Sequence, residues 1–199
     1  MWADSGLEAV AIDPGGAANA MADFIERSQL QLAAILLTHA HIDHIEGIGK
    51  LIRRNEAPVY LHPDDRRFYD NAQLQAVQFG MAIDPLPEVD GALLHGHKLK
   101  FGGLGFEVRH VPGHSPGHVL LYAESAHLAF VGDVVFQGSI GRTDLPGGNY
   151  QELMRSIRQQ VLTLPDNTLL YSGHGPPTTV GQERVSNPFL APSFGGGLA

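Results

Sequence analysis

The sequence predicts an α/β protein in which two packed mixed sheets carry helices on their outer faces. In the first half, short apolar runs alternate with helix-like stretches, which is typical of strands joined by helical crossovers. After about Leu99, apolar runs follow one another closely with turn-rich links, which favours antiparallel strands. No linker separates the halves, so one domain is expected over residues 1–190.

The elements follow from apolar spacing and from the residues that begin and end each run. In the first half we predict strands over 7–12, 32–39 and 58–62, and helices over 18–28 and 45–55. In the second half we predict strands over 104–111, 118–124 and 127–132, a helix over 150–162, and a last strand over 167–173. The Gly-rich tail, residues 191–199, is expected to be flexible.

Composition narrows the function classes. The longest apolar runs are about six residues, and the N-terminus lacks a basic and apolar leader, so a soluble, cytoplasmic protein without membrane contact is expected. The formal charge of −8 argues against nucleic-acid binding, which depends on clustered Lys and Arg. The chain has no Cys, so a metal would be bound by nitrogen and oxygen atoms. A small molecule is the expected partner, and the oligomeric state is open.

The segment Thr38–His44, which reads THAHIDH, concentrates imidazole directly behind an apolar strand. His39 and His41 lie two apart at the end of an extended run, so their side chains point to the same side and can bind one ion. Asp43 and His44 follow where the chain turns into the next helix, and they can serve a second ion. A polar turn without a metal is the alternative interpretation, and it explains so dense a cluster poorly.

Three further metal-competent residues follow at strand ends or in the adjoining loops. His114 lies in the loop VPGHSPGH, Asp133 ends the run FVGD, and His174 ends the run LLYSGH. Strand ends are where α/β sheets collect the residues of an active site. Two metal sites need more ligands than Thr38–His44 supplies, and these residues would complete them.

The motifs THAHIDHIEG, PGHSPGH, GD and SGHG, in this order and spacing, resemble the metallo-β-lactamase superfamily over nearly the whole chain. The resemblance implies an αβ/βα sandwich with the metals at the sheet edges, and it implies that an edge strand usual in that family is lacking before residue 1. Within the superfamily, VGDVVFQGSIGRTDLPGG and the ending SGHGPPTTVGQERVSNPFL look most like single-domain glyoxalase II proteins, which are hydroxyacylglutathione hydrolases.

The resemblance also implies the ligand sets and the reaction. The first ion would be bound by His39, His41 and His114, the second by Asp43, His44 and His174, and both by Asp133. Two divalent ions are implied, with zinc expected and iron or manganese as the other choices. The implied reaction is hydrolysis of a thioester, S-D-lactoylglutathione or a related acyl-glutathione, by a metal-bridging hydroxide. Asp43 would both bind a metal and orient this hydroxide.

Several residues around these motifs have two interpretations. Arg142 can bind a substrate carboxylate, or it can form an ion pair with Asp144 in its own loop. His110 and His118 can support the metal ligands by hydrogen bonds, or they are ordinary, partly buried histidines. Asp13 closes a strand before a tight turn and is expected to be structural, and the resemblance implies a second role in bracing the metal loop.

Other functions compete with thioester hydrolysis. GRTD also resembles iron-dependent persulfide dioxygenases, which would use one Fe(II). A nuclease of the same fold would need a basic surface that the sequence does not show. Two-domain glyoxalase II enzymes have a Gly-His-Glu-Tyr-Thr motif for glutathione, where this chain reads GHGPPT, so the acyl carrier is open. A non-catalytic, metal-stabilised binding protein is the last alternative.

Overall fold

The computed structural model describes residues 1–2 and 6–191. The chain divides into two compact units, Met1–Leu94 with Lys98–Gly105 and His95–His97 with Phe106–Ala199. Each unit combines strands with helices, and this confirms the α/β class. The single domain over residues 1–190 stays a prediction, and the tail predicted over 191–199 lies, apart from Ala191, outside the described residues.

The sheet of the first unit has the strand order β1-β2-β3-β4, and all three strand pairs are parallel, whereas the sequence predicted a mixed sheet here. Its strands are β1 (Glu8–Ile12), β2 (Gln31–Leu36), β3 (Val59–Leu61) and β4 (Gly91–Ala92). The crossovers contain α1 (Ala18–Arg27), then α2 (Ile42–Ile45) and α3 (Ile48–Ile52), then η1 (Pro63–Asp65), α4 (Arg66–Asp70) and α5 (Ala72–Gln78). β5 (Lys98–Phe101) also belongs to this unit. Parallel strands need such crossovers because each must return to the same end of the sheet.

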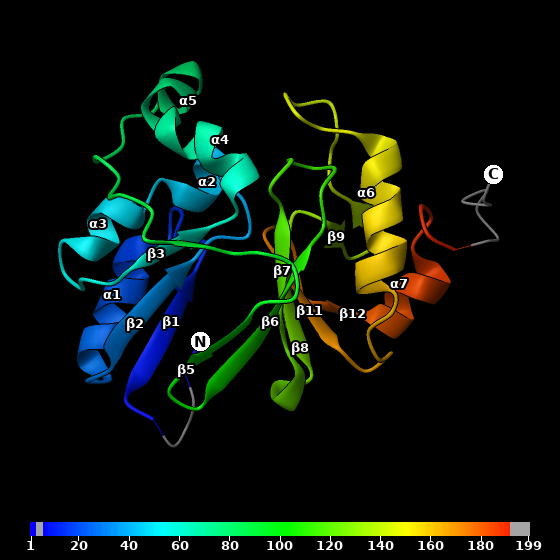
Figure 1. The fold of residues 1–199 in the computed structure, drawn as a ribbon, viewed down its shortest axis with the longest axis horizontal. Coiled ribbons are helices and arrows are strands. Elements are labelled where there is room, and N and C mark those ends of the chain that lie inside the picture. The colour runs from blue at the N-terminus through cyan, green and yellow to red at the C-terminus, as the bar shows by residue number, and fades with distance from the viewer. Residues whose placement is uncertain (3–5, 192–199) are drawn as a thin grey trace. The chain divides into compact units, whose positions relative to one another are not determined.

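One apolar cluster holds this unit together. α1 buries Ala18, Ala22 and Ile25 in a stripe of helical spacing, and the cluster includes Ile35 of β2 and Leu51 of α3. Figure 1 shows α1 and α3 together on one face of the sheet. Because the cluster anchors both ends of β2, it fixes the point from which Thr38–His44 leaves the sheet.

The sheet of the second unit is mixed, with the order β12-β11-β8-β7-β6. Its strands are β6 (Leu104–His110), β7 (Val119–Ala123), β8 (Leu128–Gly132), β11 (Leu169–Ser172) and β12 (Thr178–Thr179). The pairs β6-β7, β7-β8 and β11-β12 are antiparallel, and β8-β11 is parallel. A short turn, η2 (Glu124–Ala126), joins β7 to β8, and β9 (Val135–Phe136) pairs with β10 (Ser139–Ile140) in a hairpin of its own.

One long helical segment covers a face of this sheet. α6 (Tyr150–Ser156) begins at Asn149, whose side chain accepts a hydrogen bond from the backbone N–H of Glu152, and it continues as a π-helix, η3 (Ile157–Val161). The apolar cluster of this unit includes Leu153 from α6 and Val131 from β8. This packing holds β8, and therefore the residue that follows it, in place.

The short strands β4, β5, β9 and β10 were not predicted, and three other parts of the chain also differ from the sequence prediction. The helix expected over 45–55 is two helices, because the chain turns at Gly47, where an added Cβ would lie 2.2 Å from the carbonyl oxygen of Gly15. Residues 63–78 form η1, α4 and α5, which were not predicted. β11 is not the last element, since β12 and α7 (Val180–Ser186) follow it, the helix being capped by the Thr179 hydroxyl. Among the described residues, no helix has the length and apolar character needed to cross a membrane.

Candidate metal centre

The segment Thr38–His44, here called the histidine loop, follows β2 and leads into α2. His39 is fully buried and His44 is 4% exposed, whereas Asp43 is exposed. The ring centroid of His39 lies 4.8 Å from that of His41 and 4.1 Å from that of His44. The loop thus gathers the three imidazoles that the sequence predicts as ligands.

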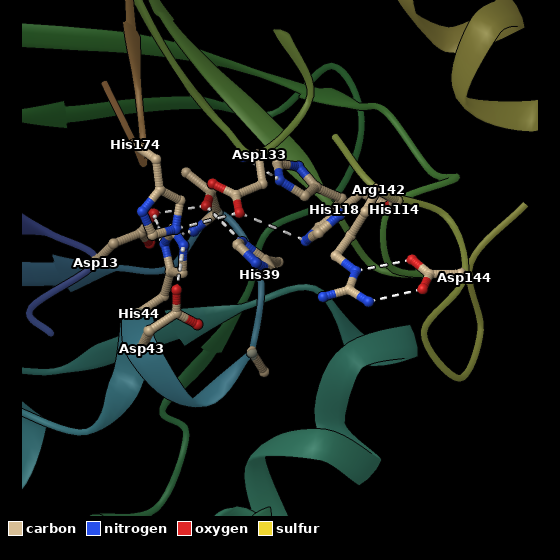
Figure 2. A network of polar contacts seen from close by, with 12 residues as sticks. Asp13, His39, Asp43, His44, His114, His118, Asp133, Arg142, Asp144 and His174 are labelled. Carbon is tan, nitrogen blue, oxygen red and sulfur yellow. Dashed lines mark hydrogen bonds and ion pairs between the residues drawn. The ribbon is translucent and has the colours of Figure 1, made fainter. Parts of the chain in front are cut away.

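Asp13 holds this loop to the end of β1 (Figure 2). Its Oδ1 accepts a hydrogen bond from the backbone N–H of Thr38 at 2.7 Å, and its Oδ2 accepts one from the Thr38 hydroxyl at 2.6 Å. The same Oδ2 lies 3.0 Å from Nδ1 of His44. Asp13 has a left-handed φ of 46°, a conformation that Asp adopts more readily than most residues. Asp13 therefore has the bracing role that the sequence suggested as its second one.

These hydrogen bonds determine which ring nitrogen of His39 and His44 can bind a metal. The Thr38 hydroxyl gives its proton to Asp13, so its oxygen accepts from Nδ1 of His39, 3.1 Å away. Nδ1 of His44 likewise donates to the Asp13 carboxylate. Both rings are held in the tautomer that leaves a lone pair on Nε2, which is the form that binds metal ions. Asp13, His39 and His44 are also one of the groups whose ligand atoms lie within 4.8 Å of one another.

A glycine makes room for the turn after the histidine loop. A Cβ added at Gly15 would lie 1.9 Å from the carbonyl oxygen of Asp43, so the turn that follows β1 packs directly on the backbone of α2. No residue with a side chain fits there unless the backbone of Gly15 or of Asp43 moves. The sequence IDPGG is therefore part of the site through contact as well as through Asp13.

In the second unit, Asp133 lies between two histidines, and we call His114, Asp133 and His174 the carboxylate cluster. Asp133 follows β8 and His174 follows β11, and these strands are parallel neighbours whose ends meet. Asp133 Oδ2 lies 3.8 Å from Nε2 of His114 and 3.5 Å from Nε2 of His174. Nδ1 of His114 donates to the carbonyl oxygen of Arg142 at 2.8 Å, which again leaves Nε2 as the ligand atom.

Two further residues fix the backbone of Asp133. His118 is fully buried, and its Nε2 accepts a hydrogen bond from the backbone N–H of Asp133 at 3.1 Å. A Cβ added at Gly141 would lie 1.8 Å from the carbonyl oxygen of Asp133 and 3.3 Å from Nδ1 of His114. His118 thus supports a predicted ligand, whereas His110 bonds the carbonyl oxygen of Pro116 at 2.8 Å and supports the loop that carries His114.

Arg142 forms the ion pair with Asp144 that the sequence offered as the alternative to substrate binding. Its Nε and NH2 groups donate to the two carboxylate oxygens at 2.7 and 2.6 Å, as Figure 2 shows. The guanidinium lowers the pKa of the Asp144 carboxyl to about 2, and the carboxylate raises the pKa of Arg142. Both side chains are exposed, and exposed ion pairs contribute little to stability. Substrate binding by Arg142 stays a prediction.

Removing this guanidinium is expected to raise the pKa of Asp144. In Arg142→Gln, the pKa should move from about 2 toward the ordinary value of 3.8, with a small depression left by the backbone hydrogen bond. Because the folded-state pKa is depressed, the pair contributes stability above that ordinary value and loses it as the pH falls toward 2. Carboxyl carbon chemical shifts followed by NMR measure this pKa, and an unchanged value would mean that the pair does not form in solution.

Two residues that the sequence analysis did not select contact the histidine loop. Oδ2 of the fully buried Asp65, at the end of η1, accepts from the backbone N–H of Ala40 at 3.0 Å. Nε2 of Gln75, in α5, donates to the Ala40 carbonyl oxygen at 3.3 Å and to that of Phe68 at 2.7 Å. One feature of the sequence could have indicated Asp65: it belongs to an acidic pair that follows Pro63 at the end of a predicted strand.

Several known proteins are similar to this chain in sequence and in fold. The family model described as "Metallo-beta-lactamase superfamily" matches residues 4–174. "Hydroxyacylglutathione hydrolase GloC" of Haemophilus influenzae is 40% identical over 197 residues, covering 96% of this chain and 90% of that protein. Two solved structures are similar. "BLEG-1 B3 metallo-beta-lactamase" has a TM-score of 0.86 at 43% identity, covering 96% of this chain and 91% of that one.

The second structure is "TTHA1623 in a di-iron-bound form", with a TM-score of 0.82 at 42% identity, covering 90% of this chain and 88% of that one. The fold of these relatives implies divalent metal ions, and the His and Asp donors of both units have the chemistry that such ions need. The chain belongs to the metallo-beta-lactamase superfamily of metallo-hydrolases.

Proposed function

We propose that this protein is a binuclear metal-dependent thioester hydrolase that acts on S-D-lactoylglutathione or a related acyl-glutathione. The observation that carries the proposal is the position of Asp133, whose Oδ2 lies within 3.8 Å of Nε2 of both His114 and His174. A carboxylate between two imidazoles is the donor arrangement that a bridging ligand requires. The similarity to a protein named hydroxyacylglutathione hydrolase supports the choice of substrate.

The proposed ligands are those that the sequence motifs imply. His39, His41 and His114 would bind the first ion, Asp43, His44 and His174 the second, and Asp133 both. The donor set fits, since it contains only imidazole and carboxylate groups, and Nδ1 of His39, His44 and His114 is already hydrogen-bonded. Zinc is the metal we propose, and a relative with a di-iron form makes iron the first alternative.

Two ions held by these groups would activate a water molecule as the nucleophile and polarise the thioester carbonyl. In this proposal Asp43, which is exposed beside His44, accepts a hydrogen bond from the attacking water and orients it. Water adds to the carbonyl carbon, the C–S bond breaks, and the products are a carboxylic acid and a thiol. No protein nucleophile is needed, which agrees with the absence of Cys from the sequence.

Arg142 is the residue that we propose for substrate recognition. Its guanidinium is exposed and is held by a single carboxylate, so a glutathione carboxylate can take the place of Asp144 with the same two-point geometry.

The cytoplasmic location stays a prediction.

The test combines metal analysis with a thiol-release assay on the same sample. Protein purified without chelator is expected to contain about two ions per chain and to release thiol from S-D-lactoylglutathione. Asp133→Asn should lose both properties, whereas Asp166→Asn, which changes an exposed carboxylate of the same unit, should keep them. Restoring chelator-treated protein with zinc, iron or manganese identifies the active metal, and a matched acyl-coenzyme A thioester tests the carrier.

Two outcomes would overturn the proposal. One iron per chain, with oxygen uptake on glutathione persulfide and no thiol release, would assign the dioxygenase reaction. Hydrolysis of a cephalosporin without thioester hydrolysis would assign the β-lactamase reaction for which the similar B3 protein is named.

A further inference from the structure

The peptide groups on either side of Ala40 are held by side chains from outside the histidine loop. The N–H of Ala40 belongs to the peptide that joins it to His39, and its C=O belongs to the peptide that joins it to His41. Asp65 binds the N–H, and Gln75 binds the C=O. Each of the two peptide planes therefore has one fixed hydrogen bond.

These two planes determine the directions of the predicted ligands. A rotation of either plane about its neighbouring bonds would swing the Cβ of His39 or His41 away from the other. Metal binding needs ligand distances correct to about 0.2 Å, so small rotations matter. Side chains that fix both peptide planes therefore determine the distance and the relative orientation of the His39 and His41 imidazoles.

The contacts of Asp65 and Gln75 fix the orientation of their side chains. Asp65 is fully buried at the start of α4, so its carboxylate cannot move to solvent. The Gln75 amide faces two carbonyl oxygens, those of Ala40 and Phe68, which require its NH₂ group rather than its oxygen at that position. Both residues come from the segment between β3 and β4, which supplies none of the predicted metal ligands.

We propose that Asp65 and Gln75 are positioning residues that set the metal affinity of the histidine loop through the two peptide groups of Ala40. The inference rests on the proposed metal ligands His39 and His41, and it adds a role for the helical segment 63–78. It is independent of which substrate is hydrolysed.

The experiment measures zinc affinity by competition with a chromogenic chelator, and the visible absorption spectrum of the cobalt-substituted protein. Asp65→Ala is expected to weaken zinc binding by about 10- to 100-fold and to change the cobalt spectrum, because groups behind metal ligands have effects of this size. Asp65→Asn should restore affinity to within about threefold, since its amide oxygen accepts the same hydrogen bond. Gln75→Leu should weaken binding by about tenfold.

Gln73→Leu is the matched control, because Gln73 lies on the same helix and its amide bonds the carbonyl oxygens of Ile83 and Asp84 instead. It should leave affinity and spectrum unchanged. Wild-type affinity and spectrum in both Asp65→Ala and Gln75→Leu would overturn the inference, as would an equal loss in the control. If Asp65→Ala does not fold, the zinc affinity and cobalt spectrum of Gln75→Leu alone test the inference. A wild-type protein that binds metal but cleaves no thioester would refute the proposed function and leave this inference standing.

Discussion

Replacing Asp43 with alanine is expected to remove one of two metal ions and to lower thioester hydrolysis more than about a hundredfold, above the usual effect of a residue that only supports a ligand. Asp43 lies in the first turn of α2, and its Oδ2 is 3.7 Å from Nε2 of His44. Because its side chain is 49% exposed, its removal should hardly change the melting temperature of the metal-free protein.

Metal content, kcat and melting temperature are measured on the same preparation of Asp43→Ala. Asp23→Ala is the control, because it removes another exposed carboxylate of the same unit, one that only pairs with Arg54. If Asp43→Ala kept two ions and full activity, Asp43 would be neither a ligand nor the group that orients water.

Adding one methyl group at Gly141 is expected to disturb the carboxylate cluster. In Gly141→Ala, the Cβ would meet the carbonyl oxygen of Asp133 at 1.8 Å and Nδ1 of His114 at 3.3 Å, so the backbone after β8 must shift. We expect a loss of about 1–3 kcal/mol or more in the free energy of unfolding, and weaker metal binding. Gly15→Ala should act in the same way on Asp43, at 1.9 Å.

Urea unfolding of the metal-free protein and zinc titration measure the two effects separately. Gly105→Ala is the control, since an added Cβ there meets nothing within 4 Å and the residue has ordinary strand geometry. If Gly141→Ala had the same free energy of unfolding and the same zinc affinity as Gly105→Ala, the close approach of Gly141 to Asp133 would affect neither stability nor metal binding.

Local patterns in the sequence were enough to predict most strands and two long helices. β1 and α1 appear within one residue of their predicted bounds, because apolar spacing reports directly which face is buried, whereas β2 ends at Leu36, three residues before its predicted end. The break at Gly47 was not predictable, since it depends on the approach of Gly15 from a distant turn. α7 could have been predicted, because Thr179 and Gln182 form the spacing of a capping box.

The predicted ligands were recognised by residue type and order, whereas the residues behind them were not. Asp65 acts on a backbone N–H, 25 residues away in sequence, so it leaves no pattern in residue types around the histidine loop. Gln75 lies on a helix that the sequence analysis did not predict, and its partner is again a backbone group. Contacts of side chains with the backbone of a distant loop require the folded structure before they can be seen.

The histidine loop is hydrogen-bonded both to a residue that precedes it in the sequence and to one that follows it, so it can form fully only late in synthesis of this unit. Its bond to Asp13 reaches 25 residues back and its bond to Asp65 reaches 25 residues forward. On a ribosome, the loop therefore stays unfinished until β3 and the turn after it have emerged, whatever metal the cell offers earlier. A nascent chain stopped before Asp65 would hold His39 and His41 by the bond to Asp13 alone, so both supports of the loop exist only after the turn that follows β3 has been synthesised.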